Sequence, residues 1–290
     1  MNMRKRLTNI KGDLSGAISA AIISIPLSIG YGIIVYGPLG AEFLPFAALL
    51  GIYGCLLGGI CAALLGGTEI QITAPKAPLS LLLAAFVAPL ALSLQIPDVA
   101  SRNILIVGLA SLCVFIAGTV QFLFGTLRLG NLIKYVPYPV VSGFMDGIAV
   151  ILILEQIGPL VGARGHVSLL EIFHNPTVVQ PLTLVVGLTT IIVIFFARRF
   201  IKAVPASLIG LIAGTALFYA LKHITGISAL GPVIGNFSFQ WPTPDILPDA
   251  FKLFDHIDLA DLFPRILITG FVLGSIGALE SLLSSVAADN

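Results

Sequence analysis

The sequence predicts an all-α protein that crosses a membrane many times. Of its 290 residues, 57% are hydrophobic and only 10% are charged, whereas a soluble domain carries about a quarter charged residues. Mean hydropathy is +1.05, and the apolar stretches are long, as from Leu184 to Phe196. A membrane β-barrel would instead show segments of about ten residues with alternating polarity. Composition and pattern together exclude a soluble globule and a barrel.

The hydropathy pattern predicts eight membrane crossings, because each crossing needs about 20 mainly apolar residues. Residues 1–12 precede the first span as a tail, and residues 13–290 form the transmembrane domain. A long polar connection, residues 222–262, separates the last two spans. The predicted spans are Ser15–Tyr36, Pro45–Leu65, Ile72–Leu94, Ile104–Phe124, Pro139–Val161, Leu182–Phe200, Pro205–Leu221 and Pro264–Ala287.

Basic residues predict the orientation, since cytoplasmic loops are enriched in Lys and Arg. With the N-terminus inside, more basic residues lie at cytoplasmic ends than at outer ends. The inner set is Arg4, Lys5, Arg6, Lys11, Arg128, Lys134, Arg198, Arg199 and Lys202, and the outer set is Arg102, Arg164, Lys222, Lys252 and Arg265. We therefore expect a multi-pass protein of the inner (plasma) membrane with a cytoplasmic N-terminus. The net charge of +1 gives no indication of nucleic-acid binding.

Two segments place Pro and Gly where a span would be interrupted in mid-membrane. Ile25–Gly32 reads IPLSIGYG, and Gly66–Pro78 reads GGTEIQITAPKAP. In the second, residues 68–73 alternate polar and apolar like a strand, and Pro75 then permits a helix to begin. Irregular backbone at this depth is tolerated only where it lines a cavity, and the N-terminus of a half-helix attracts an anion. The pattern predicts a short strand and a broken half-helix in the third span, at an anion site.

Three motifs resemble the SulP family of sulfate permeases and related anion exchangers, and the similarity covers nearly the whole chain. Gly12–Tyr31 begins GDLSGA and ends IPLSIGY, similar to the family's Asp-Leu-x-x-Gly followed by Pro-Gln-(Gly/Ser)-x-Ala-Tyr. Pro137–Phe144 reads PYPVVSGF, similar to Pro-Val-(Ile/Leu)-Ser-Gly-Phe. Glu280–Asp289 reads ESLLSSVAAD and resembles Glu-Ser-Leu-Leu-Ser-x-x-x-Ala-Asp. One departure is Leu27, which stands where Gln is usual.

The resemblance implies a transporter fold of two inverted seven-helix repeats. This chain would supply about spans 1–8, that is, the first repeat and the start of the second. Transport would then need a C-terminal half with the remaining spans, which a cytoplasmic STAS domain usually follows. We expect a homodimer in the lipid bilayer. The implied function is secondary transport of a small inorganic anion by alternating access, with sulfate and H⁺ as the first expectation.

Glu280 is the first candidate site residue. A carboxylate in mid-span costs roughly 2.5–3.5 kcal/mol on insertion, so it is functional by default. The resemblance implies that Glu280 lies beside the substrate and couples transport to H⁺, while Ser284 follows one turn later on the same face. Lys76 stands at the predicted start of the half-helix, where its ammonium would hold an anion directly. The alternatives are a Glu280 that only hydrogen-bonds backbone, and a Lys76 that reaches the cytoplasmic surface or pairs with Glu69 or Glu280.

Four further residues complete the predicted substrate site. Ser28 and Tyr31 match first-span positions that approach the anion in the family, and Thr73 and Ala74 would supply strand and backbone contacts. The alternative for Ser28 and Tyr31 is ordinary helix packing. The sequence shows no metal-ligand spacing, so we expect no metal and no cofactor.

Several other functions remain open from the sequence. Within transport, the alternatives are Na⁺-coupled bicarbonate, chloride or a dicarboxylate, or a nucleobase in a permease of the same fold. A non-transporting half-transporter or assembly partner is a rival of another class. An enzyme is disfavoured, because the spans contain no HExxH, no GxSxG and no paired aspartates.

Overall fold

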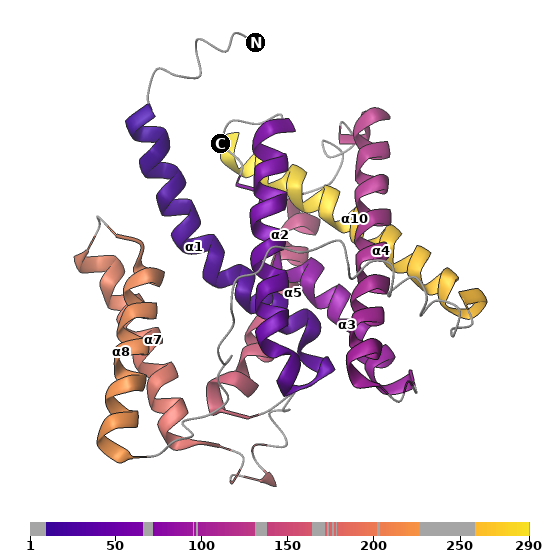
Figure 1. The fold of residues 1–290 in the computed structure, drawn as a ribbon. Helices are drawn as coiled ribbons and strands as arrows, with labels where there is room; N and C mark the ends of the chain where they lie inside the picture. The colour runs from indigo at the N-terminus through magenta and orange to yellow at the C-terminus, as the bar shows by residue number, and fades with distance from the viewer. Residues whose placement is uncertain are drawn as a thin grey trace. The chain divides into compact units, whose positions relative to one another are not determined.

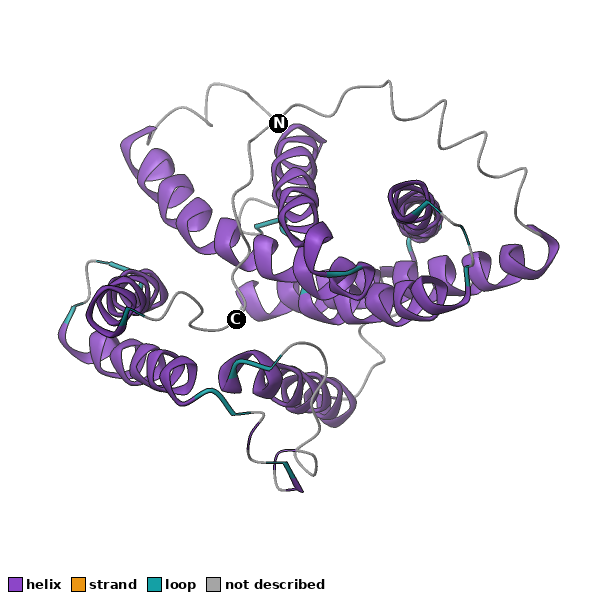
Figure 2. Cartoon of the chain, turned by 60° about the horizontal axis from the view of Figure 1, so that its bottom comes forward, coloured by secondary structure: helices purple, strands orange, loops and turns teal. Residues whose placement is uncertain are grey.

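In the computed structural model of this chain, the regular elements among the described residues are all helices (Figures 1 and 2). It describes residues 10–65, 72–94, 96, 98–130, 138–163, 172, 174–175, 177, 179–201, 204–226 and 259–289. The long helices are α1 (Ile10–Tyr36), α2 (Leu44–Leu65), α3 (Ala77–Ser93), α4 (Val99–Thr126), α5 (Tyr138–Val161), α7 (Pro181–Phe200), α8 (Ala206–Thr225) and α10 (Leu259–Asp289). Two short 3₁₀ helices, η2 (Gly37–Leu39) and η3 (Ala41–Phe43), join α1 to α2.

Each predicted span coincides with one of these helices, so the all-α membrane fold is confirmed. Among the described residues, six segments are long and apolar enough to cross a membrane: Ile10–Leu39, Ala41–Leu65, Val99–Thr126, Pro181–Phe200, Ala206–Thr225 and Leu262–Ser285. The predicted tail of residues 1–12 overlaps α1, which begins at Ile10. Residues 1–9 and most of the predicted polar connection lie outside the described residues.

The predicted interruption of the first span is wrong. Helix α1 runs without a break from Ile10 to Tyr36, with Pro26 inside it. A proline removes one backbone hydrogen bond from a helix, and in a membrane neighbouring groups satisfy the carbonyl that is set free. The sequence Ile25–Gly32 therefore places a proline in the helix without ending it.

The third span is short, as the sequence predicts. Helix α3 has 17 residues, which at 1.5 Å each is about 26 Å, less than the roughly 30 Å of a bilayer's hydrocarbon core. Before it, residues 72–76 carry neither helix nor strand, and residues 68–71 of the predicted strand lie outside the described residues. Pro78 occupies the first turn of α3, where its missing N–H has no helical partner to lose.

The chain divides into two compact units, described here separately. One contains residues 1–27 and 149–234, and the other contains residues 28–148 and 235–290. In the first unit, α7 packs closely on α8. A methyl group on Gly214 would lie 3.4 Å from the Thr190 Cβ atom, so small residues of α8 set the close approach.

The second unit is built around α4, which α10 crosses and packs against closely (Figure 1). Glycines of α10 face α4: methyl groups on Gly270 and Gly274 would lie 3.0 Å from the Cys113 oxygen and 2.8 Å from the Val120 Cβ atom. Leu105, Ile106 and other fully buried side chains of α3, α4 and α10 form the core. Large apolar side chains also point outward, as Phe115 does with 72% of its surface exposed, which suits contact with lipid.

Helices α1 and α2 cross in this second unit with their backbones in contact. A methyl group on Gly32 would lie 2.9 Å from the Gly51 nitrogen, and one on Gly51 would lie 2.8 Å from the Ser28 carbonyl carbon. Real Cβ atoms do not approach backbone so closely. Glycine at both positions therefore fixes how α1 lies on α2, and with it the position of Tyr31.

Candidate functional site

The predicted site residues Ser28, Tyr31, Thr73, Ala74, Lys76, Glu280 and Ser284 all belong to the second unit. Lys76 is the residue that caps α3 at its N-terminal end. Its backbone is extended (φ −122°, ψ 143°), and its side chain makes no capping hydrogen bond. The Lys76 carbonyl accepts from the Ser80 nitrogen at 3.0 Å and from Ser80 Oγ at 2.9 Å. These bonds fix the first turn of α3, at whose N-terminus free N–H groups and the helix dipole favour an anion.

Three side chains from three helices meet near this point. Glu280 of α10 interacts electrostatically with Lys76 of α3, and Tyr31 of α1 interacts with Glu280. The three residues are partly buried. The structure thus brings together three of the predicted site residues, although they are far apart along the chain.

Two polar atoms of this cluster lack hydrogen-bond partners among the described residues. Lys76 Nζ and Glu280 Oε2 are each buried and unpaired, so the two do not hydrogen-bond to each other through these atoms. A buried polar group without a partner costs about 1–3 kcal/mol, and more if it is charged. Native proteins satisfy nearly all such groups, and those left open mark places where a ligand, ion or water binds.

Ser284 and the segment before α3 frame the cluster. Ser284 is exposed, and its hydroxyl donates to the Glu280 carbonyl at 2.8 Å, one turn earlier on α10. Thr73 is exposed and Ala74 half-buried. Helix α2 lies beside this segment: methyl groups on Gly54 and Gly59 would lie at the ordinary contact distance of 3.8 Å from Pro75 Cγ and from the Thr73 oxygen. Helix α2 therefore supports the irregular backbone from which Thr73 and Ala74 would contact an anion.

Ser28 lies where α1 and α2 cross. It is fully buried, and its carbonyl faces Gly51 of α2. Its place in helix packing is therefore clear, while a direct contact between Ser28 and an anion stays a prediction.

Gln121 of α4 was missed by the sequence reasoning. A methyl group on Gly277 would lie 2.5 Å from Gln121 Nε2 and 3.4 Å from Leu79 Cδ1, so the amide lies at the junction of α3, α4 and α10. Gly277 precedes Glu280 by three residues on α10. A carboxamide within an apolar span is itself a signal of function or of a specific partner.

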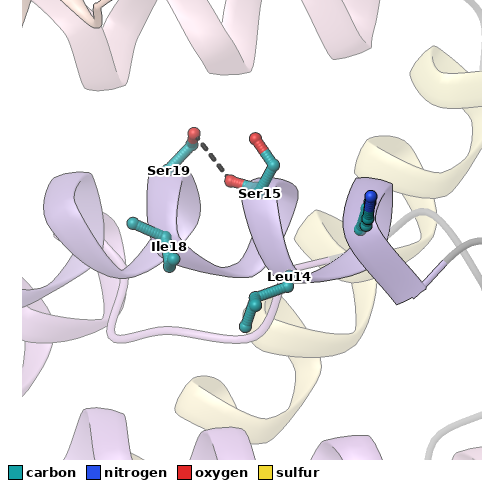
Figure 3. Close-up of a pocket in the computed structure, with 5 residues that line it drawn as sticks. Leu14, Ser15, Ile18 and Ser19 are labelled. Carbon is teal, nitrogen blue, oxygen red and sulfur yellow. Dashed lines mark hydrogen bonds between the residues drawn. The ribbon is translucent and has the colours of Figure 1, made fainter.

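Two hollows elsewhere in the described residues do not coincide with the cluster. One lies on α1 and is lined by Lys11, Leu14, Ser15, Ile18 and Ser19, with Ser19 Oγ donating to the Ser15 carbonyl at 2.9 Å (Figure 3). All five residues belong to one helix, so they cannot enclose a ligand. The other lies between α3 and α10, and its lining is apolar except for Arg265 and Thr269.

Comparison with known proteins identifies relatives along nearly the whole chain. The model of the sulfate permease family matches residues 10–290. The bicarbonate transporters BicA of Picosynechococcus sp. and Synechocystis sp. are 31% and 32% identical to this chain over 97% of its length and 46% of their own. Sulfate transporter 2.2 of Arabidopsis thaliana is 29% identical over 67% of the chain and 28% of its own length.

A solved structure gives the same result for the fold. The transmembrane domain of a cyanobacterial bicarbonate transporter BicA matches 98% of this chain, with a TM-score of 0.75 and 30% sequence identity, and the match covers 66% of that domain. The chain spans about half the length of the bicarbonate transporters that it resembles. The family match and these relatives, all named as membrane transporters, confirm the resemblance drawn from the three motifs and the assignment to a protein that is not an enzyme.

Proposed function

Because this chain belongs to the sulfate permease family, we propose that it forms the anion-holding part of a secondary transporter for a small inorganic oxyanion. The observation that carries this proposal is the Lys76 ammonium where α3 begins, which is buried and has no hydrogen-bond partner among the described residues, Glu69 lying outside them. An oxyanion bound there would accept a charge-assisted hydrogen bond from Nζ. It would also face the first N–H groups of α3, those of Ala77 and Leu79, since Pro78 has none.

Glu280 is the coupling residue in this proposal. Its carboxylate interacts with Lys76, so a charged Glu280 and a bound anion compete for the same ammonium. A cation that neutralises Glu280 would release Lys76 for the anion. Binding of the cation and of the anion would then favour each other, which is the linkage that symport requires.

The chemistry of the substrate decides which cation fits. A proton suits sulfate, which stays ionised at neutral pH. A proton that meets bicarbonate forms carbonic acid, so a bicarbonate transporter would need Na⁺ instead. Sulfate with H⁺ is our first candidate, because Glu280 is a simple carboxyl that can take up a proton. Bicarbonate with Na⁺ is the second, because the relatives that match nearly the whole chain are named bicarbonate transporters.

The proposal also includes the setting of the site. The chain would lie in the inner membrane with its N-terminus in the cytoplasm, supported by the bias of basic residues toward one side. It would act as a homodimer, in a protein that supplies the remaining spans, and alternating access would expose the site to each side in turn.

Uptake into proteoliposomes tests substrate and cation together. The protein expressed from its whole gene would be reconstituted and offered radiolabelled sulfate or bicarbonate, each under an inward H⁺ or Na⁺ gradient. We expect sulfate uptake that rises with the H⁺ gradient. Bicarbonate uptake that rises only with Na⁺ would replace the first candidate with the second. Uptake of a nucleobase, or of none of these solutes, would contradict oxyanion transport.

The variant Glu280→Gln tests the coupling role, since it keeps the size of the side chain and removes its charge. We expect sulfate uptake that no longer responds to the H⁺ gradient. Glu42→Gln is the matched control, because Glu42 is an exposed carboxylate of η3 in the same unit. A Glu280→Gln protein that keeps the full response would contradict the role of Glu280.

A further inference from the structure

The amide of Gln121 lies against Gly277, three residues before the proposed coupling residue on α10, and belongs to no predicted site. Gly277 is buried, and a methyl group there would lie 2.5 Å from Gln121 Nε2. Any residue larger than glycine at position 277 would therefore have to displace the amide. The missing side chain of Gly277 forms a slot on α10 that the Gln121 amide occupies.

Glu280 follows Gly277 by three residues on α10. On a helix, Cβ positions three residues apart lie about 5–6 Å from each other, so the positions of Gly277 and Glu280 are neighbours on the surface of α10. Gln121 has a long side chain that is largely exposed, and a rotation about its own bonds moves the amide by several ångströms. Such a rotation can bring the amide toward Glu280, whose Oε2 atom is buried and has no hydrogen-bond partner among the described residues.

We propose that Gln121 is a positioning residue for Glu280, whose carboxylate accepts a hydrogen bond from the Gln121 amide when no cation is bound there. This inference rests on the proposed function of Glu280. The amide would hold the ionised carboxylate in place and leave it when the carboxyl takes up a proton. The charged or titratable groups that face Glu280 in the described residues are Lys76 from α3 and Tyr31 from α1.

The consequence is a defined change in the proton affinity of one carboxyl group. A donor that binds the ionised form favours that form. Loss of the donor should therefore move the midpoint of Glu280 protonation to higher pH, by about one pH unit for a hydrogen bond to a charged group. The affinity for the anion should change much less, because Lys76 and the first turn of α3 remain intact.

Infrared difference spectroscopy across a pH series measures this midpoint directly in the reconstituted protein. The carboxyl C=O band of Glu280 is the band that disappears in Glu280→Gln. We expect the midpoint of this band to lie about one pH unit higher in Gln121→Leu than in the original protein. Gly277→Ala should shift it in the same direction, because the added methyl displaces the amide. Gln156→Leu, which removes an exposed glutamine of α5, should leave it unchanged.

The same variants in the sulfate uptake assay separate this inference from the proposed function. An unchanged infrared midpoint in both Gln121→Leu and Gly277→Ala would overturn the inference, whatever the uptake rates. A lower maximal uptake rate without a midpoint shift would assign Gln121 a structural role only. Absent sulfate uptake in the original protein would contradict the proposed function, while the infrared midpoint would still decide whether Gln121 acts on Glu280. If Gln121→Leu fails to elute as a folded protein on size-exclusion chromatography, Gly277→Ala decides alone.

Discussion

The crossing of α1 and α2 makes a stability prediction that two neighbouring glycines of α1 can test. At Gly32 an added methyl group would lie 2.9 Å from the Gly51 nitrogen, and closer still to the Ala47 carbonyl oxygen. At Gly30 the added methyl would point into open space, with no neighbouring element within 4 Å in the described residues. Gly30→Ala and Gly32→Ala are therefore the same chemical change on the same helix, in two different surroundings.

The two surroundings give effects of different size and sign. Replacing glycine by alanine inside a helix stabilises it by about 0.5–1 kcal/mol, and this gain applies at both positions. At Gly32 the methyl group also meets backbone atoms of α2, which cannot rotate away. Overpacking of this kind costs about 1–3 kcal/mol. Gly30→Ala should therefore be slightly more stable than the original protein, and Gly32→Ala less stable than Gly30→Ala by about 1–3 kcal/mol.

Thermal unfolding of the purified protein in one detergent, followed by circular dichroism, measures the difference between the two variants. Because the helix-propensity gain is common to both, their difference isolates the steric cost at the crossing. A Gly32→Ala protein that unfolds at the same temperature as Gly30→Ala would refute the close contact of α1 with α2. It would also remove the reason for regarding the position of Tyr31 as fixed by that contact.

Two further outcomes can be measured on other parts of the chain. Lys76→Ala should raise the sulfate concentration for half-maximal uptake by about tenfold or more, because a charge-assisted hydrogen bond is lost. The control is Lys222→Ala, at an exposed lysine of α8. An unchanged half-maximal concentration in Lys76→Ala would show that Lys76 does not contact the anion. Hydrogen bonds from the Ser101 side chain and backbone hold the pKa of the Asp98 carboxyl below its ordinary 3.8. A lowered pKa means that Asp98 stabilises the folded state above that ordinary value and loses this effect as the pH falls through the folded pKa. The thermal stability lost in Asp98→Ala should thus be largest near neutral pH and smallest in acid, and a loss that does not vary with pH would contradict the charged cap of α4.

Much of the fold could be predicted because a membrane span is recognisable from one continuous stretch of sequence. Twenty apolar residues in succession have few alternatives to a membrane helix, and each predicted span contains a helix in the described residues, although residues 72–76 of the third span are not helical. The start of α3 was equally readable, since Pro75 lies just before the helix and Pro78 suits its first turn, where a missing N–H has no helical partner to lose. The prediction of a break at Pro26 was wrong, because a proline near glycines gives the same local pattern whether or not the helix ends there, and α1 continues through Pro26. Neighbouring helices, rather than the local sequence, decide whether a membrane proline ends a helix.

The candidate site was predictable only where a single residue carried the signal. A charge within an apolar span is conspicuous by itself, so Lys76 and Glu280 could be named, and the structure brings them together. Gln121 gave a weaker signal, and its relation to Glu280 depends on the register of α4 against α10. That register is set by Gly270, Gly274 and Gly277 where they face α4. Spacing along the sequence contains no information about a contact of this kind.

In the proposed mechanism, the geometry of Lys76 and Glu280 would let one site hold an anion and yet release it. A fully hydrogen-bonded ion pair between them would be stable and would leave no donor for a substrate. Here the two groups interact electrostatically, while Lys76 Nζ and Glu280 Oε2 stay buried and unpaired. Each charge lowers the cost of burying the other, while each group keeps hydrogen-bonding capacity for another partner. The remaining cost must be offset elsewhere, and the closely packed core of α3, α4 and α10 can supply that stability. The proposed coupling would follow from this arrangement, because whatever neutralises one member of the pair changes what the other can bind.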